Sequence, residues 1–238
     1  MEKYSCKDNK LYTDTDGHKH TLPADIERTS MSIITAELAA RNIDLAEAHA
    51  PIIKRVIHTT ADFDYAKSLR FTQDAVAKGV AALGRGAHIV TDTNMTKAGI
   101  SEPSLARLAS HVHCFMADTD VKTAARQNGT TRAVASMDKA YEHFPNALLV
   151  VGNAPTALLH IVELMEKGLR PPMVIAVPVG FVNVVESKEK LFAACEKYGV
   201  PAIVAMGRKG GSNVAAAICN ALLYIATDTL DPTERGWK

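Results

Sequence analysis

Five short apolar runs, separated by amphipathic stretches, constrain the fold of this 238-residue chain more than any other feature. The runs lie at 88–92, 111–116, 147–152, 173–177 and 201–206. Short apolar runs bounded by turn residues are typical of buried strands, and the stretches between them have helical spacing. These β-α repeats predict an α/β fold, with a mainly parallel sheet flanked by helices in a single domain with Rossmann-like layering.

Three of the predicted helices carry an apolar stripe. The stripes are Val134, Met137, Tyr141 and Phe144; Leu158, Ile161, Val162 and Met165; and Val214, Ile218, Ala221, Leu222 and Ile225. In the N-terminal third, Met31, Ile34 and Leu38 also predict a helix. The segment PIIKRVIHTT, which begins at Pro51, fits a short helix or a strand. We favour the helix because the apolar side chains from Leu45 to Val56 keep helical spacing and a proline is tolerated near a helix start.

The two ends of the chain differ in composition from the middle. Residues 1–24 are polar and predict an N-terminal extension, and residues 227–238 predict a C-terminal tail, which leaves 25–226 as the domain. His18 and His20 in the extension are expected to be solvated rather than to bind metal.

Charge and cysteine content exclude several classes of protein. Lys and Arg total 27 against 26 Asp and Glu, so the chain lacks the basic bias of a nucleic-acid binder. The four cysteines are far apart, which favours neither a zinc site nor a disulfide framework. No apolar run approaches the ~20 residues that span a bilayer. We expect a soluble cytoplasmic protein with no membrane partner.

Four loops that follow predicted strands are expected to meet where open α/β sheets bind ligands. They are DTNMT (92–96), GNAPT (152–156), PVGFVN (178–183) and GRKGGS (207–212). GRKGGS matches neither a Walker loop nor a dinucleotide loop. Its glycines suit an anion at a helix start, or a turn with Ser212 as the helix cap. In GNAPT, Asn153 suits a helix cap and also a ligand contact.

Two further side chains suit chemistry. His58 lies in KRVIHTTADF among basic, hydroxyl and acidic neighbours that can tune an imidazole for proton transfer, although a structural histidine also fits there. Arg132 in NGTTR suits either bidentate binding of a carboxylate or a solvated surface position. The spacing of the histidines, serines and cysteines indicates no nucleophilic triad.

Seven ordered blocks of the chain resemble the precorrin-8X methylmutase family from about residue 25 to 225. They are IERTSMSIITAEL, KRVIHTTADFDYA, VTDTNMTKAGI, NGTTRAVASM, VVGNAPTALL, PVGFVNVVESKEKL and MGRKGGSNVAAAICNAL. The resemblance implies an isomerase of cobalamin biosynthesis that moves a methyl group from C-11 to C-12 of precorrin-8 or cobalt-precorrin-8, giving hydrogenobyrinate or cobyrinate. It also implies a tetrapyrrole substrate, a homodimer, and no redox cofactor or external methyl donor.

The same resemblance assigns roles to single residues. His58 inherits the role of proton donor and acceptor to the macrocycle. The substrate contacts that it implies are Ser30, Arg55, Asp92, Asn94, Met95, Arg132 and Asn153, with the 207–212 loop as a further candidate. HTTADF looks like the anaerobic, cobalt-containing branch, and because the sequence has no recognisable cobalt-ligand set, cobalt is expected to arrive inside the substrate. The alternatives are a noncatalytic corrinoid-binding protein and a nucleotide-binding protein.

Overall fold

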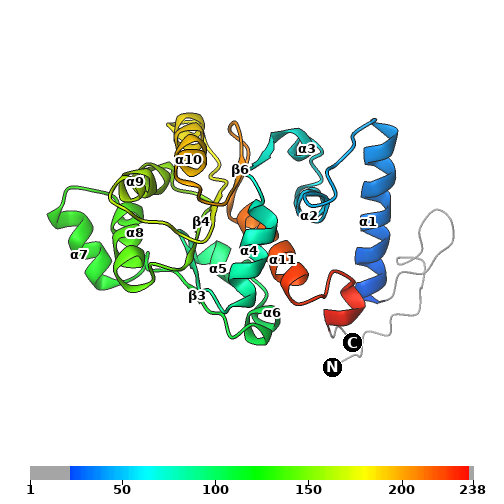
Figure 1. Ribbon diagram of the computed structural model, residues 1–238, viewed down its shortest axis with the longest axis horizontal. Coiled ribbons are helices and arrows are strands. Elements are labelled where there is room, and N and C mark those ends of the chain that lie inside the picture. Colours follow the sequence, from blue (N-terminus) through cyan, green and yellow to red (C-terminus); the bar gives the residue numbers. More distant parts are fainter. Residues whose placement is uncertain (1–21, 236–238) are drawn as a thin grey trace, which may run out of the picture.

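A six-stranded sheet forms the centre of the computed structural model, which describes residues 22–235 (Figure 1). Its strands are β1 (Leu69–Phe71), β2 (Ile89–Thr91), β3 (Val112–His113), β4 (Leu148–Val151), β5 (Val174–Ala176) and β6 (Ala202–Ala205). They are arranged in the order β1-β6-β5-β4-β2-β3, and within this sheet β1 runs antiparallel to its neighbour β6. The other four pairings are parallel, which confirms the predicted mainly parallel sheet.

Helices cover both faces of this sheet, as predicted (Figure 1). The helices on one side of the sheet are α2 (Ala50–Thr60), α3 (Tyr65–Ser68), α4 (Ala75–Gly84), α5 (Asn94–Gly99), α6 (Glu102–Arg107) and α11 (Ser212–Ala226), and α1 (Pro23–Ala40) packs against α2. The other is covered by α7 (Thr119–Gln127), α8 (Arg132–His143), α9 (Pro155–Glu166) and α10 (Val184–Tyr198). We call these the α11 face and the α8 face.

The strands alternate between the two cores. In β4, Leu148 and Val150 pack into the core on the α11 face, whereas Leu149 and Val151 pack into the core on the α8 face. A parallel strand that is buried on both faces is apolar at nearly every position, and this is why the runs that become β2, β4, β5 and β6 are visible in the sequence, whereas β3 is a half-buried edge strand. The edge strand β1 was not predicted, because its three residues include the exposed Arg70 and form no apolar run.

The predicted stripe of α8 is wrong at Tyr141, which is 37% exposed. The buried face of this helix is formed mainly by Ala133, Met137 and Ala140, because small side chains let the helix approach its neighbours closely. The helix prediction for PIIKRVIHTT is confirmed by α2, which begins at Ala50.

The last described residues fold back onto α1. A short 3₁₀ helix, η2 (Pro232–Arg235), packs against α1, and the two lie side by side in Figure 1. His18 and His20 lie outside the described residues. Within residues 22–235, no helix is long and apolar enough to cross a membrane.

Thr72 joins β1 to the rest of the sheet and provides a test of this edge. Its buried hydroxyl accepts the N–H of Ala202 at 2.8 Å and donates to the carbonyl of Val200 at 3.4 Å. We expect Thr72→Val to lower the free energy of unfolding by about 1–3 kcal/mol, because the Ala202 N–H loses its partner. Urea denaturation measures the change. Thr72→Ser, which keeps the hydroxyl, is the control and should lose less, and equal losses in both variants would contradict the hydrogen-bond explanation.

Candidate functional site

Asp92 connects two of the loops at the carboxyl edge of the sheet. Its side chain is 1% exposed and follows β2. Oδ1 accepts the N–H of Gly152, and Oδ2 accepts the N–H groups of Asn153 and Ala154, all at 2.8 Å. Burial raises the pKa of Asp92, and the three N–H donors oppose that effect. Asp92 therefore fixes the start of α9 through these three hydrogen bonds. Its carboxylate oxygens face backbone N–H groups rather than the open surface.

Two helix caps differ from the sequence prediction. Ala154 precedes the first residue of α9, so Asn153 is not its cap; Asn153 lies exposed one residue earlier, and the carboxylate of Asp92 serves the N–H groups there. Gly211 precedes the first residue of α11, so Ser212 is not a cap either. Ser212 instead places its hydroxyl 2.8 Å from that of Thr93.

The hydroxyl contact of Thr93 brings a third loop into the same assembly. Thr93 caps α5 by accepting the N–H of Thr96, and its contact with Ser212 joins the 92–96 loop to the 207–212 loop. Gly152 lies between them, since a Cβ there would be only 2.9 Å from the Cα of Ser212 and 3.1 Å from Oγ1 of Thr96. The loops after β2, β4 and β6 are therefore in direct contact, as predicted from the topology.

A buried lysine that the sequence did not single out holds the 207–212 loop in place. Lys188 on α10 has no exposed surface, and its ammonium group donates to the carbonyl oxygens of Gly207 and Lys209 at 2.8 and 2.9 Å. Burial lowers the pKa of Lys188 to about 8. At Gly210 the loop passes so close to β5 that a Cβ would meet the carbonyl oxygen of Val177, which requires a glycine. In the sequence, Lys188 is visible only as one lysine within an amphipathic helix, and nothing there indicates that it is buried.

Ion pairs join the 207–212 loop to the segment that follows His58. The ammonium group of Lys209 lies 2.6 Å from a carboxylate oxygen of Asp62 and 2.6 Å from one of Asp64. These two carboxylates raise the pKa of Lys209. The HTTADF segment and the GRKGGS loop, which are far apart in the sequence, are therefore neighbours in the structure.

A second charged cluster joins α1, α2 and η2. Both carboxylate oxygens of Glu27, which is 5% exposed, accept from Arg235 at 2.7 and 2.8 Å, and Arg55 donates to the same carboxylate. Burial alone would raise the pKa of Glu27, but its two guanidinium partners bring it below the usual value. The Tyr224 ring lies 3.7 Å from the Arg235 guanidinium carbon. Ser30, one turn along α1, donates its hydroxyl hydrogen to the carbonyl oxygen of Ile26.

His58 lies one turn after Arg55 on α2 and is exposed. Partial burial lowers its pKa, the positive charges of Arg55 and Arg235 lower it further, and the negative charge of Glu27 opposes them. Within the described residues its imidazole makes no side-chain hydrogen bond. The ring nitrogens can therefore interact with a ligand, and at neutral pH the imidazole is mainly uncharged.

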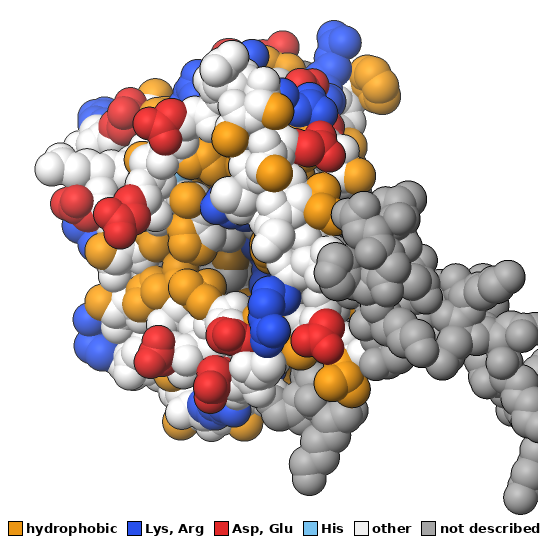
Figure 2. Space-filling view, turned by 90° about the vertical axis from the view of Figure 1, so that its right-hand side faces the viewer, with side chains coloured by type: hydrophobic (Ala, Val, Ile, Leu, Met, Phe, Trp, Pro, Cys, Tyr) orange, Lys and Arg blue, Asp and Glu red, His pale blue; other side chains and the backbone are white. Residues whose placement is uncertain are grey.

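Exposed apolar side chains surround the polar groups of this edge. Met95, Phe181 and Val182 are 71%, 82% and 78% exposed; Met95 lies at the start of α5, and the other two lie in the loop after β5. Figure 2 views the molecule from the side on which α1 lies in Figure 1, and hydrophobic side chains gather around the middle of that face with Lys or Arg among them. Asn94 is also exposed, at the start of α5.

Arg132 begins α8 beside the same group of loops. Its side chain is exposed and donates to the carbonyl of Met116 at 3.4 Å, a long contact. The residue before it, Thr131, pairs its hydroxyl with that of Thr156 in the 152–156 loop at 3.2 Å. The predicted site residues thus form two groups: Asp92, Asn94, Met95, Arg132 and Asn153 around the loops, and Ser30, Arg55 and His58 on α1 and α2. The two groups are connected through Lys209.

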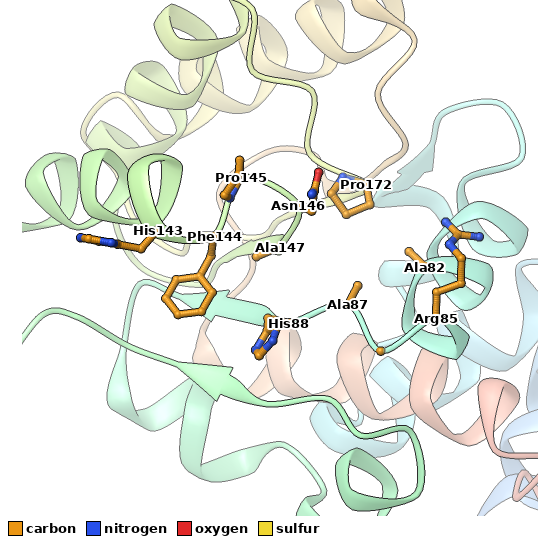
Figure 3. Close-up of a pocket in the computed structure, with 11 residues that line it drawn as sticks. Ala82, Arg85, Ala87, His88, His143, Phe144, Pro145, Asn146, Ala147 and Pro172 are labelled. Carbon is orange, nitrogen blue, oxygen red and sulfur yellow. The ribbon is translucent and has the colours of Figure 1, made fainter.

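A cavity within the described residues lies away from these loops. Its volume is about 630 Å³, and its lining includes the residues just before β2, β4 and β5, which places it at the amino edge of the sheet (Figure 3). Among residues 22–235, no three His, Cys, Asp or Glu side chains converge in a way that would hold a metal ion.

Comparison with known proteins decides the family. Residues 25–225 match the family described as precorrin-8X methylmutase. The chain belongs to this family. It is 45% identical over 206 residues to cobalt-precorrin-8 methylmutase of Salmonella typhimurium, which covers 85% of this chain and 95% of the relative. It is 39% identical over 200 residues to precorrin-8X methylmutase of Pseudomonas aeruginosa, with coverages of 83% and 93%.

Solved structures agree with this assignment. The structure of precorrin-8x methyl mutase from Thermus thermophilus superposes with a TM-score of 0.77 at 39% identity, covering 85% of this chain and 98% of that one. The predicted family and its isomerase activity in cobalamin biosynthesis are thus confirmed.

The Glu27 cluster predicts a large effect on stability. Glu27→Gln should lower the free energy of unfolding by about 3–5 kcal/mol, because two guanidinium groups lose their buried counter-charge. The matched control on α1 is Glu37→Gln, which removes an exposed pair with Arg41 and should cost less than about 1 kcal/mol.

The pH dependence of the Glu27→Gln effect follows from the lowered pKa of Glu27. Its contribution is fully present above the ordinary value of 4.5 and is lost as the pH falls through the lower folded-state value. Chemical denaturation between pH 7 and pH 3 checks both statements. A difference between native and variant proteins that does not shrink with acid would contradict the ionic explanation.

Proposed function

We propose that this protein moves a methyl group from C-11 to C-12 of cobalt-precorrin-8, with His58 as the residue that transfers protons. The observation that supports this most is the setting of His58: its exposed imidazole is close enough to the Glu27 cluster for those charges to affect its pKa, and Asp62, four residues later, pairs with Lys209. This ion pair brings it beside the loops at which ligands of open α/β sheets bind.

The surface around these loops suits an acidic tetrapyrrole. Met95, Phe181 and Val182 present apolar surface to the faces of a macrocycle. Arg132 and Arg208 are exposed at the same edge and can receive carboxylates at its rim. The N–H groups at the start of α11 add a partial positive charge.

The pKa of His58 matters for the proton transfer. An imidazolium whose pKa is lowered gives up its proton more readily, so His58 protonates the macrocycle and makes it electron-deficient. The methyl group then migrates within the macrocycle, and the proton returns to the neutral imidazole. Because reactant and product are isomers, no electron or external methyl group enters the balance.

Three further features belong to this proposal. We expect no resident cofactor, since cobalt enters within the substrate. A cobalt-containing substrate is supported by the HTTADF segment and by the 45% identity to cobalt-precorrin-8 methylmutase of Salmonella typhimurium. We also expect the chain to act as a homodimer with no nucleic-acid or membrane partner, and to work in the cytoplasm.

Parallel incubation with the two substrates tests the reaction and the branch. Cobalt-precorrin-8 should be converted with the larger kcat/KM, and precorrin-8x should react more slowly, as monitored by the visible spectrum of the macrocycle. ATP and NAD should not displace the corrinoid product. Binding of the product without turnover of either substrate would favour a noncatalytic carrier, and micromolar nucleotide binding without corrinoid binding would contradict the proposal entirely.

Substitution of His58 tests its role. His58→Ala and His58→Asn should fold and bind the corrinoid product, but lose about 10²–10⁴-fold in single-turnover rate. In the native protein, kcat/KM should rise as the pH falls through a value below 6.5, because the protonated imidazole is the donor, and both variants should lose this ionisation.

His143→Ala is the matched control, since this exposed histidine ends α8 on the opposite face. It should keep near-native turnover. Thermal melting and the corrinoid spectrum check folding and binding in each variant. Near-native turnover by a folded His58→Ala protein would exclude His58 as the proton-transfer residue.

A further inference from the structure

An arginine from the C-terminal segment lies close enough to His58 for its charge to affect the imidazole. Arg235 lies beyond residue 225, where the match to the family ends, and it belongs to η2, which Figure 1 shows in red beside α1. It is the last described residue, yet its side chain is only 5% exposed. An arginine is rarely buried unless it is paired, so the partners of Arg235 indicate what it does.

The partners of Arg235 hold its guanidinium group in place. Nη1 donates to both carboxylate oxygens of Glu27 at 2.7 and 2.8 Å. Nε donates to the carbonyl oxygen of Thr229 at 2.8 Å, and Nη2 donates to that of Leu230 at 2.7 Å. The guanidinium carbon lies 3.7 Å from the centre of the Tyr224 ring on α11. One side chain thus connects α1, α11 and the segment after α11, which requires the planar fork of arginine.

The same carboxylate holds the second arginine of the cluster. Arg55 donates to Oε1 of Glu27, and its guanidinium carbon lies 5.2 Å from the centre of the Tyr224 ring. Arg55 and His58 are three residues apart on α2, so their side chains are neighbours on the helix surface. Because Arg235 fixes both oxygens of Glu27, it also fixes the acceptor to which Arg55 is bound.

We propose that Arg235 is a positioning residue of the methylmutase site: it holds Glu27, and through Glu27 it holds Arg55 beside His58. This inference rests on the proposed function, in which His58 transfers the proton, and on the resemblance, which implies that Arg55 contacts the substrate. The buried guanidinium group of Arg235 acts through Glu27 rather than on the substrate. The segment after α11 therefore contributes to the site, although it lies outside the family match.

The charges around His58 give this role a measurable signature. Arg55 lies on the same helix, Glu27 on α1 and Arg235 on η2. Of the other helices that pack against α2, α11 contains no Asp, Glu, Lys, Arg or His, and α3 carries the exposed Lys67. Partial burial lowers the pKa of His58, the two arginines lower it further, and the carboxylate opposes them. The pKa of His58 therefore reports the charge at position 235.

NMR titration of the histidine ring signals tests this arrangement in the folded full chain, without substrate. The signal of His58 is identified by its absence in His58→Asn. Its pKa should rise in Arg235→Met, because a positive charge is lost, and it should fall in Glu27→Gln, because a negative charge is lost. In Arg235→Lys, which keeps the charge, it should stay near the native value. An unchanged pKa in Arg235→Met would overturn the proposal.

Turnover of cobalt-precorrin-8, measured at the pH at which each protein is most active, separates positioning from charge. Arg235→Met should lower kcat at least ~tenfold, because misplaced groups at a reacting centre slow the reaction. Its affinity for the corrinoid product should change less, since the guanidinium group is buried. Arg235→Lys should lower kcat about threefold, because an ammonium group lacks the planar fork. A native kcat in Arg235→Lys would overturn the proposal, even where Arg235→Met fails to fold.

Arg107→Met is the matched control. Arg107 is exposed and also contacts η2, but it donates to the carbonyl oxygen of Glu234 rather than to Glu27. It should keep the native kcat and the native pKa of His58, and thermal melting checks folding in every variant. Equal losses in Arg107→Met and Arg235→Met would overturn the specific role of Arg235.

The two measurements also separate this inference from the function on which it rests. A native chain that converts neither substrate would contradict the proposed function, whatever the titration shows. An active native chain whose folded Arg235→Met variant keeps the native kcat and the native pKa of His58 would contradict the role of Arg235 alone.

Discussion

Two buried charges shape the carboxyl edge of the sheet, and backbone groups rather than opposite charges compensate both. The carboxylate of Asp92 accepts three N–H groups, and the ammonium group of Lys188 donates to two carbonyl oxygens. A buried ion without partners would be very unfavourable, so these hydrogen bonds are strongly maintained. Asp92 joins the loops after β2 and β4, Lys188 holds the loop after β6 against α10, and the contact between Thr93 and Ser212 joins the loops after β2 and β6, so the three loops form one surface.

The same principle governs the neighbourhood of His58, but here with side chains. Two guanidinium groups share the single carboxylate of Glu27, which leaves an excess of positive charge close to the imidazole. Partial burial lowers the pKa of His58, this excess of positive charge lowers it further, and the same charge makes the region favourable for an acidic ligand. A chain with a formal net charge of +1 can therefore meet a polyanionic ligand through local clusters.

The two faces of the sheet hold histidines in different environments. His58 lies on α2, which packs against α11 on one face, whereas His88 and His113 lie on the other face beside α8. The first imidazole has no side-chain hydrogen bond among the described residues, and the other two are held against each other by ring contacts. The nitrogens of His58 therefore remain open to a ligand, whereas Nδ1 of His88 and Nε2 of His113 are already paired with each other.

The sequence by itself determined the parallel core and the family, and it predicted that the loops after the strands meet at one edge of the sheet. Strands buried on both faces must be apolar throughout, and ordered blocks such as KRVIHTT identify relatives. It did not reveal β1, whose edge position places no apolar demand on Arg70, or the exposure of Tyr141. Tertiary structure alone decided the partners of Asp92, Lys188 and Glu27, since Glu27 and Arg235 are 208 residues apart. Hydrogen bonds and ion pairs depend on distances in space, and local patterns in a chain carry no record of those distances.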